Sequence, residues 1–94
     1  MSIKTKPFDV AEHLETDDDI WEFLAEVLET GTTSDFLHAL NTAARAKGMT
    51  EVARQAGVTR ASLYKSLSAD GNPRFETIHK IVEALGGHLS VVGQ

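Results

Sequence analysis

Cysteine is absent from the 94 residues of this chain. Its absence excludes a disulfide framework, a zinc–thiolate site and catalysis by a cysteine nucleophile. Long hydrophobic runs are also missing: no stretch approaches the roughly 18 apolar residues that a membrane-spanning helix needs. The first ten residues lack the apolar core of a secretion signal. We therefore expect one small domain that works in the cytoplasm.

Residue groups that carry out chemistry are scarce as well. No nucleophile, glycine-rich phosphate loop or metal-ligand spacing accompanies the acidic run 17–19, which is typical of the first turn of a helix. The four histidines are scattered through the chain without the spacing of a metal site. The sequence therefore predicts no enzyme, no cofactor and no metal site.

The charge is unevenly distributed along the chain. The net charge is −5, which by itself argues against a nucleic-acid partner. Residues 1–35 hold ten acids and two bases, a balance of −8, whereas residues 36–94 hold seven bases and four acids, a balance of +3. The acidic N-terminal part and the mildly basic C-terminal part predict two faces of the molecule with two different partners.

Hydrophobic spacing predicts a string of short helices, so the expected fold class is all-α. Apolar residues recur at helical intervals from Ile20 to Leu28, and Trp21 with Phe23 is expected to widen this buried stripe. Phe75 is expected on the apolar face of the last helix. The predicted elements are a turn over 7–14, helices over 16–30, from Thr32 or Thr33 to 47, over 51–56 with Thr50 as its cap, over 60–67 and over 73–85, and a β-strand over 88–92.

The most specific pattern lies in residues 49–67. Gly57 stands where a helix–turn–helix turn needs a residue that tolerates a positive φ. Ala53, four residues earlier, is small enough to let two helices cross closely, and Thr59 is placed to cap the second helix. A helical hairpin whose polar face only meets water is the alternative. The residues expected to point inward are Val52, Val58, Leu63 and Leu67.

The second helix of this pattern carries side chains that suit the major groove of DNA. Arg and Lys pair with guanine, a small apolar group contacts a thymine methyl, and Ser and Tyr bind phosphates or bases. Tyr64 suits stacking beside the groove and packing at its edge equally well. The residues expected to point outward are Arg60, Ala61, Ser62, Tyr64 and Lys65.

Two family resemblances follow from these residues. Residues 36–86 resemble the five-helix, phage-repressor-like (Xre/Cro-type) helix–turn–helix domain, with 59–67 in the place of its recognition helix. The whole chain resembles the HigA-like antitoxins called probable addiction module antidote proteins. The segments that carry this second resemblance are KTKPFDVAEHLETDDDIWEFLAEVLETGT, MTEVARQAGV, RASLYKSL and NPRF.

The resemblance implies a function. It implies an antitoxin of a type II toxin–antitoxin module that neutralises a RelE/HigB-like toxin and represses its own operon. It also implies that Arg74 reaches toward the minor groove or a phosphate, and that Thr59, Arg60, Ala61, Tyr64 and Lys65 face base edges. A stand-alone phage-type repressor and a protein-binding helical module without DNA binding are the alternatives.

Three parts of the chain are expected to play different roles. Residues 1–35 form an acidic helical extension packed on the domain, residues 36–87 form the DNA-binding domain, and residues 88–94 form a strand or tail. The acids Glu22, Glu26 and Glu29 share one helix side, which is either a solvated face or a docking surface for a small basic toxin. A strand over His88–Val92 needs a partner strand, so symmetric pairing with a second copy would build a homodimer; a frayed tail is the alternative.

Overall fold

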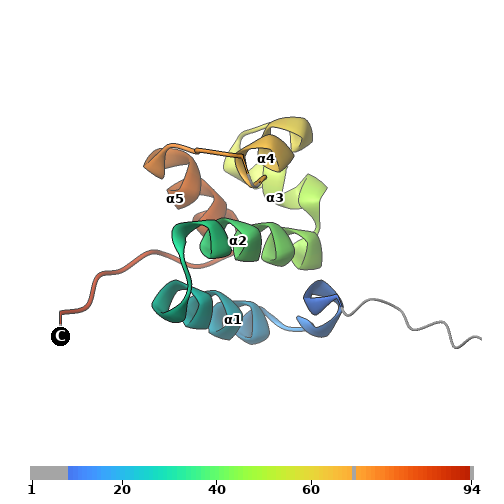
Figure 1. The fold of residues 1–94 in the computed structure, drawn as a ribbon. Helices are drawn as coiled ribbons and strands as arrows, with labels where there is room; N and C mark the ends of the chain where they lie inside the picture. Colours follow the sequence, from blue (N-terminus) through green and yellow to red (C-terminus); the bar gives the residue numbers. More distant parts are fainter. Residues whose placement is uncertain (1–8, 69, 94) are drawn as a thin grey trace, which may run out of the picture.

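The computed structural model describes residues 9–68 and 70–93, and within them it is built from helices alone (Figure 1). The all-α prediction is therefore confirmed. None of the described helices is long and apolar enough to cross a membrane. The elements are a 3₁₀ turn η1 (Val10–His13) and the helices α1 (Asp17–Thr30), α2 (Thr33–Lys47), α3 (Met49–Ala56), α4 (Arg60–Ser66) and α5 (Phe75–Ala84).

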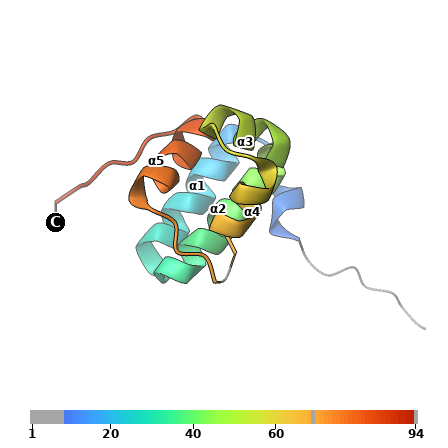
Figure 2. The same ribbon diagram turned by 90° about the horizontal axis from the view of Figure 1, so that it is seen from above.

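Helix α2 lies at the centre of the molecule. Helix α1 packs on one side of it, and α3, α4 and α5 lie on the other side (Figures 1 and 2). Leu40, Ala43 and Ala44 of α2 are completely buried, and they join a single core with residues of every other α-helix. The small alanines allow the neighbouring helices to approach α2 closely.

Threonine caps define where the two long helices begin. The Thr16 hydroxyl accepts a hydrogen bond from the backbone N–H of Asp19 at 3.1 Å, and the Asp19 carboxylate accepts one in return from the Thr16 N–H. Thr32 and Asp35 repeat this capping box at the start of α2. Such reciprocal bonds satisfy backbone donors that a helix start leaves unpaired. The predicted cap at Thr16 is confirmed, and Thr32 rather than Thr33 caps α2.

A tight turn joins α3 to α4. Gly57 adopts the left-handed conformation, with φ 74° and ψ 28°, as its place in the sequence predicts. The Val58 N–H returns to the Ala53 carbonyl at 3.0 Å, and the Thr59 hydroxyl accepts from the Ser62 N–H at 3.0 Å to cap α4. Leu63 and Leu67 are buried as expected and anchor α4 on the core.

Three expectations about the helices are corrected. The helix α3 starts at Met49 after Gly48, so Thr50 lies inside the helix and does not cap it. Residues 33–84 hold four α-helices, and five are reached in the described chain only by including α1. Of the turn predicted over 7–14, residues 7–8 lie outside the described residues, and η1 is its described part. Phe75 is 73% exposed, because no described element covers the first turn of α5.

The fourth correction concerns the C-terminal segment. The strand predicted over residues 88–92 is absent, and the described residues 87–93 have no regular structure. Strand hydrogen bonds require a second strand, and the described part of the chain offers none. Val91 and Val92 are 100% and 84% exposed, and the segment runs away from the helices (Figure 1).

Candidate nucleic-acid interface

Helix α4 presents one polar face to solvent. Its opposite side is anchored by Leu63, which is 1% exposed, and by Leu67 in the position after the helix. Of the side chains between these two leucines, Tyr64 and Lys65 face outward. The structure places all the residues predicted to contact DNA from this helix at the surface: Thr59, Arg60, Ala61, Ser62, Tyr64 and Lys65.

The Arg60 guanidinium is held in place by two neighbours. Its Nη1 donates a hydrogen bond to the Thr50 hydroxyl on α3 at 3.1 Å. The guanidinium carbon also lies 5.8 Å from the centre of the Tyr64 ring, one turn further along α4. A guanidinium has five N–H donors, so most of them remain available for an acceptor from outside. Tyr64 is 40% exposed and stacks with a cation.

The pairing of cations divides the described basic residues into two groups. Arg45, Lys47, Arg54 and Lys80 each form an ion pair, with Asp9, Asp17, Glu51 and Glu76 respectively. In residues 9–68 and 70–93, the basic side chains that form none are Arg60, Lys65 and Arg74. The unneutralised cations are therefore those of α4 and of the residue that precedes α5.

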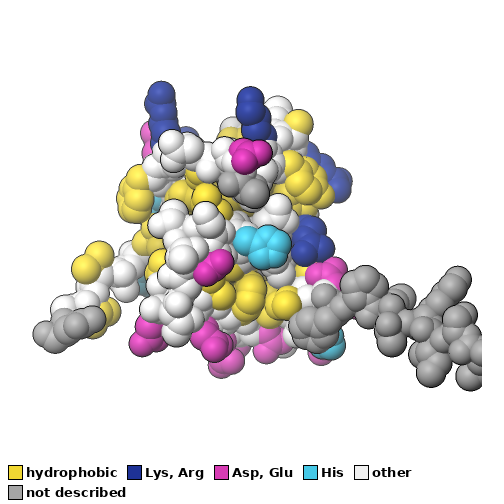
Figure 3. Space-filling model, in the orientation of Figure 1, with side chains coloured by type: hydrophobic (Ala, Val, Ile, Leu, Met, Phe, Trp, Pro, Cys, Tyr) yellow, Lys and Arg dark blue, Asp and Glu magenta, His cyan; other side chains and the backbone are white. Residues whose placement is uncertain are grey.

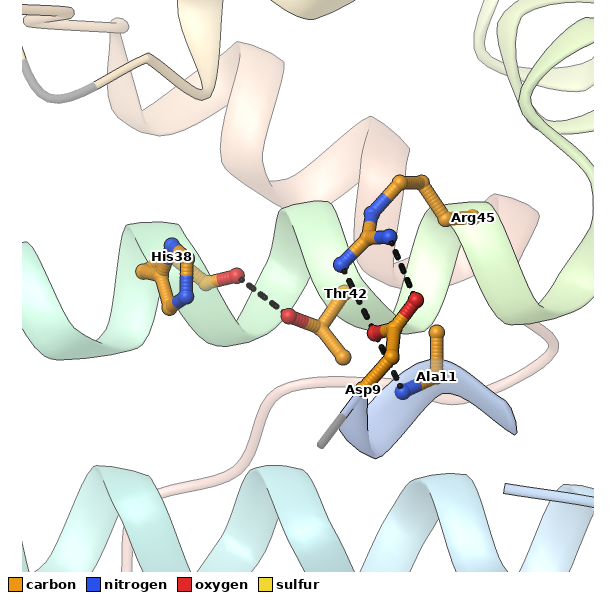
Figure 4. Close-up of polar contacts among 5 residues, drawn as sticks. All are labelled: Asp9, Ala11, His38, Thr42 and Arg45. Carbon is orange, nitrogen blue, oxygen red and sulfur yellow. Dashed lines mark hydrogen bonds and ion pairs between the residues drawn. The ribbon is translucent and has the colours of Figure 1, made fainter. Parts of the chain in front are cut away.

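The ion pair of Arg45 ties the N-terminal turn to α2. Asp9 accepts two hydrogen bonds from the guanidinium, at 3.1 and 3.3 Å, and a third from the Ala11 N–H (Figure 4). The Arg45 hydrogen bonds and the Ala11 bond lower the pKa of Asp9. On the same helix the Thr42 hydroxyl donates to the His38 carbonyl at 3.1 Å, which satisfies a buried polar group (Figure 4). Arg45 thus serves structure rather than an external anion.

Glu51 on α3 is surrounded by donors from its own helix. Arg54 Nε lies 3.0 Å from one carboxylate oxygen, and Gln55 Nε2 lies 2.8 Å from the other. The Arg54 bonds and then the Gln55 bond lower the pKa of Glu51 to about 2. The same pairing raises the pKa of Arg54. This cluster leaves little net charge on the outer face of α3.

Arg74 lies at the start of α5, after the loop that follows α4. It is exposed, and as the N-cap residue it makes no side-chain capping bond. Next to it, Phe75 stacks on the His79 ring with the ring centres 6.3 Å apart. Arg74 and Phe75 therefore place a cation and an exposed aromatic ring beside one another at the edge of this end of the molecule.

The acidic face lies at the other side of α2. Glu22, Glu26 and Glu29 of α1 are all exposed, and none of them forms an ion pair with another described residue. Figure 3 shows acidic side chains gathered along α1, whereas Lys and Arg side chains project from the end formed by α4 and α5. The unpaired carboxylates of α1 and the unpaired cations of α4 and Arg74 therefore lie on opposite sides of α2, although acids such as Glu76 and Glu83 are also exposed on α5. Within the described part of the chain, no group of three or more potential metal ligands is found.

Sequence reasoning missed two features. Thr50 was expected to cap a helix, but its hydroxyl holds Arg60; a threonine facing the second helix of this motif is the only signal for that role. Trp21 packs against the core as expected, but it is only partly buried, and it also lines an apolar groove that was not expected from the sequence. The run of apolar residues 21, 24, 25 and 28, wider than one buried stripe requires, is the signal for the groove.

Comparisons with known proteins find relatives over nearly the whole chain. Residues 4–93 match the model of a family described as "Probable addiction module antidote protein". A protein of Haemophilus influenzae (strain KW20 / Rd), named only as an uncharacterized protein, is 45% identical over 91 residues, which cover 97% of this chain and 94% of that protein. No solved structure matches the chain. With a family match of this extent, the chain belongs to the probable addiction module antidote protein family.

Proposed function

We propose that this protein is the antitoxin of a type II toxin–antitoxin module, which binds operator DNA through α4 and neutralises a small basic toxin. The antidote family supports the antitoxin role. The protein works by binding and carries out no reaction, in the cytoplasm where its operator lies. The observation that carries the DNA-binding part is the set of cations without an acidic partner, Arg60, Lys65 and Arg74.

The helix–turn–helix assignment of α3 and α4 supports this reading. In that motif the second helix enters the major groove while the first crosses the backbone. The left-handed Gly57, the Thr59 cap and the buried Leu63 give α4 a rigid attachment to the core. Arg60 at the first turn of α4 is then the guanine-reading residue. Thr59, Ala61, Tyr64 and Lys65 face base edges beside it, and Arg74 reaches the minor groove or a phosphate.

A homodimer completes the DNA-binding unit in this proposal. Residues 36–94 of one chain carry a net charge of only +3, so one copy attracts DNA weakly. Pairing of residues 88–92 between two copies would satisfy backbone groups that are unpaired in one chain and cover Val91 and Val92. A two-fold dimer would present two α4 helices to half-sites about one DNA turn apart, roughly 34–36 Å.

The toxin contact is assigned to the acidic side of α1. A RelE/HigB-like toxin, an RNA-cutting protein, is expected to be basic, because it must bind a polyanion. Glu22, Glu26 and Glu29 offer it three unpaired carboxylates on one helix. Like charges spaced one turn apart mildly destabilise a free helix, and a cationic partner relieves that repulsion.

The DNA-binding part is tested by fluorescence anisotropy with promoter DNA of the gene itself. Wild-type protein is titrated into labelled promoter and scrambled duplexes at two salt concentrations. We expect tighter binding to the promoter and a loss of affinity at the higher salt, because phosphate contacts release counterions. Arg60→Ala should weaken promoter binding by about 1–3 kcal/mol and scrambled binding much less. Lys80→Ala is the matched control, since Lys80 is exposed but paired with Glu76.

Each alternative function predicts a different result. Equal loss on both duplexes for Arg60→Ala would make Arg60 a phosphate contact. Binding without promoter preference or salt dependence would leave a protein-binding helical module. Tight promoter binding without a small basic reading frame beside the gene would favour a stand-alone repressor.

A further inference from the structure

An apolar groove of about 460 Å³ lies between α1 and the segment that follows α5. Its floor is formed by buried side chains, Leu24 at 7% and Val82 at 6% exposure. Leu28, which is 55% exposed, lies at its open side. The groove is lined by Trp21, Leu24, Ala25, Leu28, Phe36 and Val82 together with residues 86–90.

Two glycines hold the chain against the Trp21 ring and so shape one wall. A Cβ atom on Gly87 would lie 2.9 Å from Cζ3 of the indole, and one on Gly86 would lie 3.3 Å from Cζ2. The backbone therefore lies close to the ring, where a residue with a side chain would force the indole to shift. The Trp21 ring is clamped on this side, and the groove is a formed feature of the fold rather than a gap between flexible side chains.

The acidic face borders this groove along α1. Trp21, Ala25 and Leu28 line the groove, and each is followed by a glutamate, at 22, 26 and 29. Consecutive helix residues are about 100° apart around the axis, so the glutamates form a ridge next to the apolar stripe. Helix α1 contains six acids and no base. One surface of the molecule thus joins an apolar recess to a row of unneutralised carboxylates.

We propose that the groove and the acidic ridge form one docking surface for a cationic segment of a partner protein. The partner's Lys or Arg side chains pair with Glu22, Glu26 and Glu29, and an apolar side chain enters the groove between Trp21 and Leu28. This proposal rests on the antitoxin function, since the toxin is the partner it describes. It adds the anchor, because exposed charges alone give orientation but little affinity, whereas a buried apolar side chain gives affinity.

Charge decides against a second copy of the chain as the occupant. The segment that a second copy could insert, Val91–Val92, is apolar but carries no cation. A cationic segment that also carries an apolar side chain suits both the acidic ridge and the groove.

Trp21 provides the measurement, because it is the single tryptophan of the chain and lines the groove. The probe is a synthetic helical peptide without aromatic residues, rich in Lys, with two leucines on one face. We expect its titration to shift the Trp21 emission saturably, and added salt to weaken binding because exposed charges are screened. A peptide with serines in place of the leucines and one with Glu in place of Lys should leave the emission unchanged.

Protein variants separate the two parts of the surface. Leu28→Ser should weaken peptide binding about tenfold without unfolding the protein, since the side chain is more than half exposed. The triple variant Glu22→Gln, Glu26→Gln, Glu29→Gln should remove most of the salt dependence. The double variant Glu76→Gln, Glu83→Gln removes two exposed acids from α5 and should bind the peptide like wild type.

Three outcomes would overturn the proposal. The first is no change of the Trp21 emission on adding the peptide. The second is peptide binding that is unaffected by both Leu28→Ser and the triple variant. The third is an emission change that depends on protein concentration alone and persists in high salt, which would place a second copy in the groove. The proposed function fails separately: if the surface binds the peptide but the protein does not neutralise the toxin encoded beside it, the groove stands and the antitoxin role falls.

Discussion

The turn between α3 and α4 gives the sharpest stability prediction, because a substitution at Gly57 lowers the free energy of unfolding only through backbone conformation and not through a clash. Gly57 has φ 74° and ψ 28°, and a Cβ atom added there would meet nothing within 4 Å. Gly57→Ala therefore introduces no clash. It forces an L-residue into the left-handed region, at about 1–2 kcal/mol. Alanine also restricts the unfolded chain, which returns part of this, about 0.4–1 kcal/mol. The expected net loss is about 1 kcal/mol.

Thermal unfolding followed by circular dichroism measures this loss. For a domain of this size, a change of 1 kcal/mol lowers the melting temperature by about 4–8 °C. Gly57→Asn should lose less, since asparagine tolerates the left-handed region better than alanine. Gly93→Ala is the matched control: its Cβ also meets nothing within 4 Å, and its φ is not positive. If Gly57→Ala unfolds at the same temperature as wild type, the left-handed conformation assigned to Gly57 in the turn between α3 and α4 is wrong.

Three further stability predictions concern the core, a cap and the response to acid. Leu63→Asp should abolish the folded circular dichroism spectrum, because it buries an unpaired charge at a site 1% exposed, whereas Leu63→Ala should fold with about 2–5 kcal/mol less stability in urea. Thr32→Ala removes the hydroxyl that accepts from the Asp35 N–H and should cost about 1 kcal/mol, with Thr33→Ala near wild type. The pKa of Glu51 is lowered from 4.5 to about 2, so its bonds are intact above pH 4.5 and are lost as the pH falls to about 2; in melts across this range, Glu51→Gln should lose stability less steeply than wild type.

The sequence predicts the parts of the fold that depend on local chemistry. Thr16 and Thr59 cap helices as expected, because a hydroxyl reaches backbone donors two or three residues ahead whatever the rest of the chain does. The positive φ of Gly57 follows from the same short-range reasoning. The predicted start of α3 was wrong, because tertiary packing decides where this helix begins. Met49 is 5% exposed, and its burial in the core places the start of the helix at Met49, one residue before Thr50.

Two other expectations failed because periodicity does not tell which surface will be covered. Phe75 fits the apolar spacing of α5, yet in the described residues nothing packs over the first turn of that helix. Residues 88–92 have strand-forming side chains, but strand structure depends on a partner that one chain does not supply. Apolar residues exposed for this reason are candidates for contacts with other molecules.

For the candidate site, the exposure of α4 could be predicted and the pairing of its charges could not. The helical repeat that buries Leu63 turns Lys65, two positions further on, to the opposite side of the helix, and Arg60, one turn before Leu63, is exposed as its charge predicts. The partners of the other cations come from far along the sequence: Arg45 meets Asp9 across 36 positions, and Lys47 meets Asp17 across 30. Only the folded chain reveals that these bases are neutralised and that those of α4 are not.

The separation of the two charged surfaces has a consequence for their partners. Helix α2 lies between α1 and the α3–α4 pair, so a segment docked on α1 and a duplex on α4 occupy opposite sides (Figure 1). The two proposed surfaces therefore do not overlap on this chain. The coupling that remains between the two binding events is electrostatic. A cationic partner on α1 neutralises carboxylates that repel DNA phosphates. Salt screens this repulsion beyond about 8 Å at physiological ionic strength. On this argument, toxin binding strengthens operator binding in dilute buffer, and the gain disappears as salt is added.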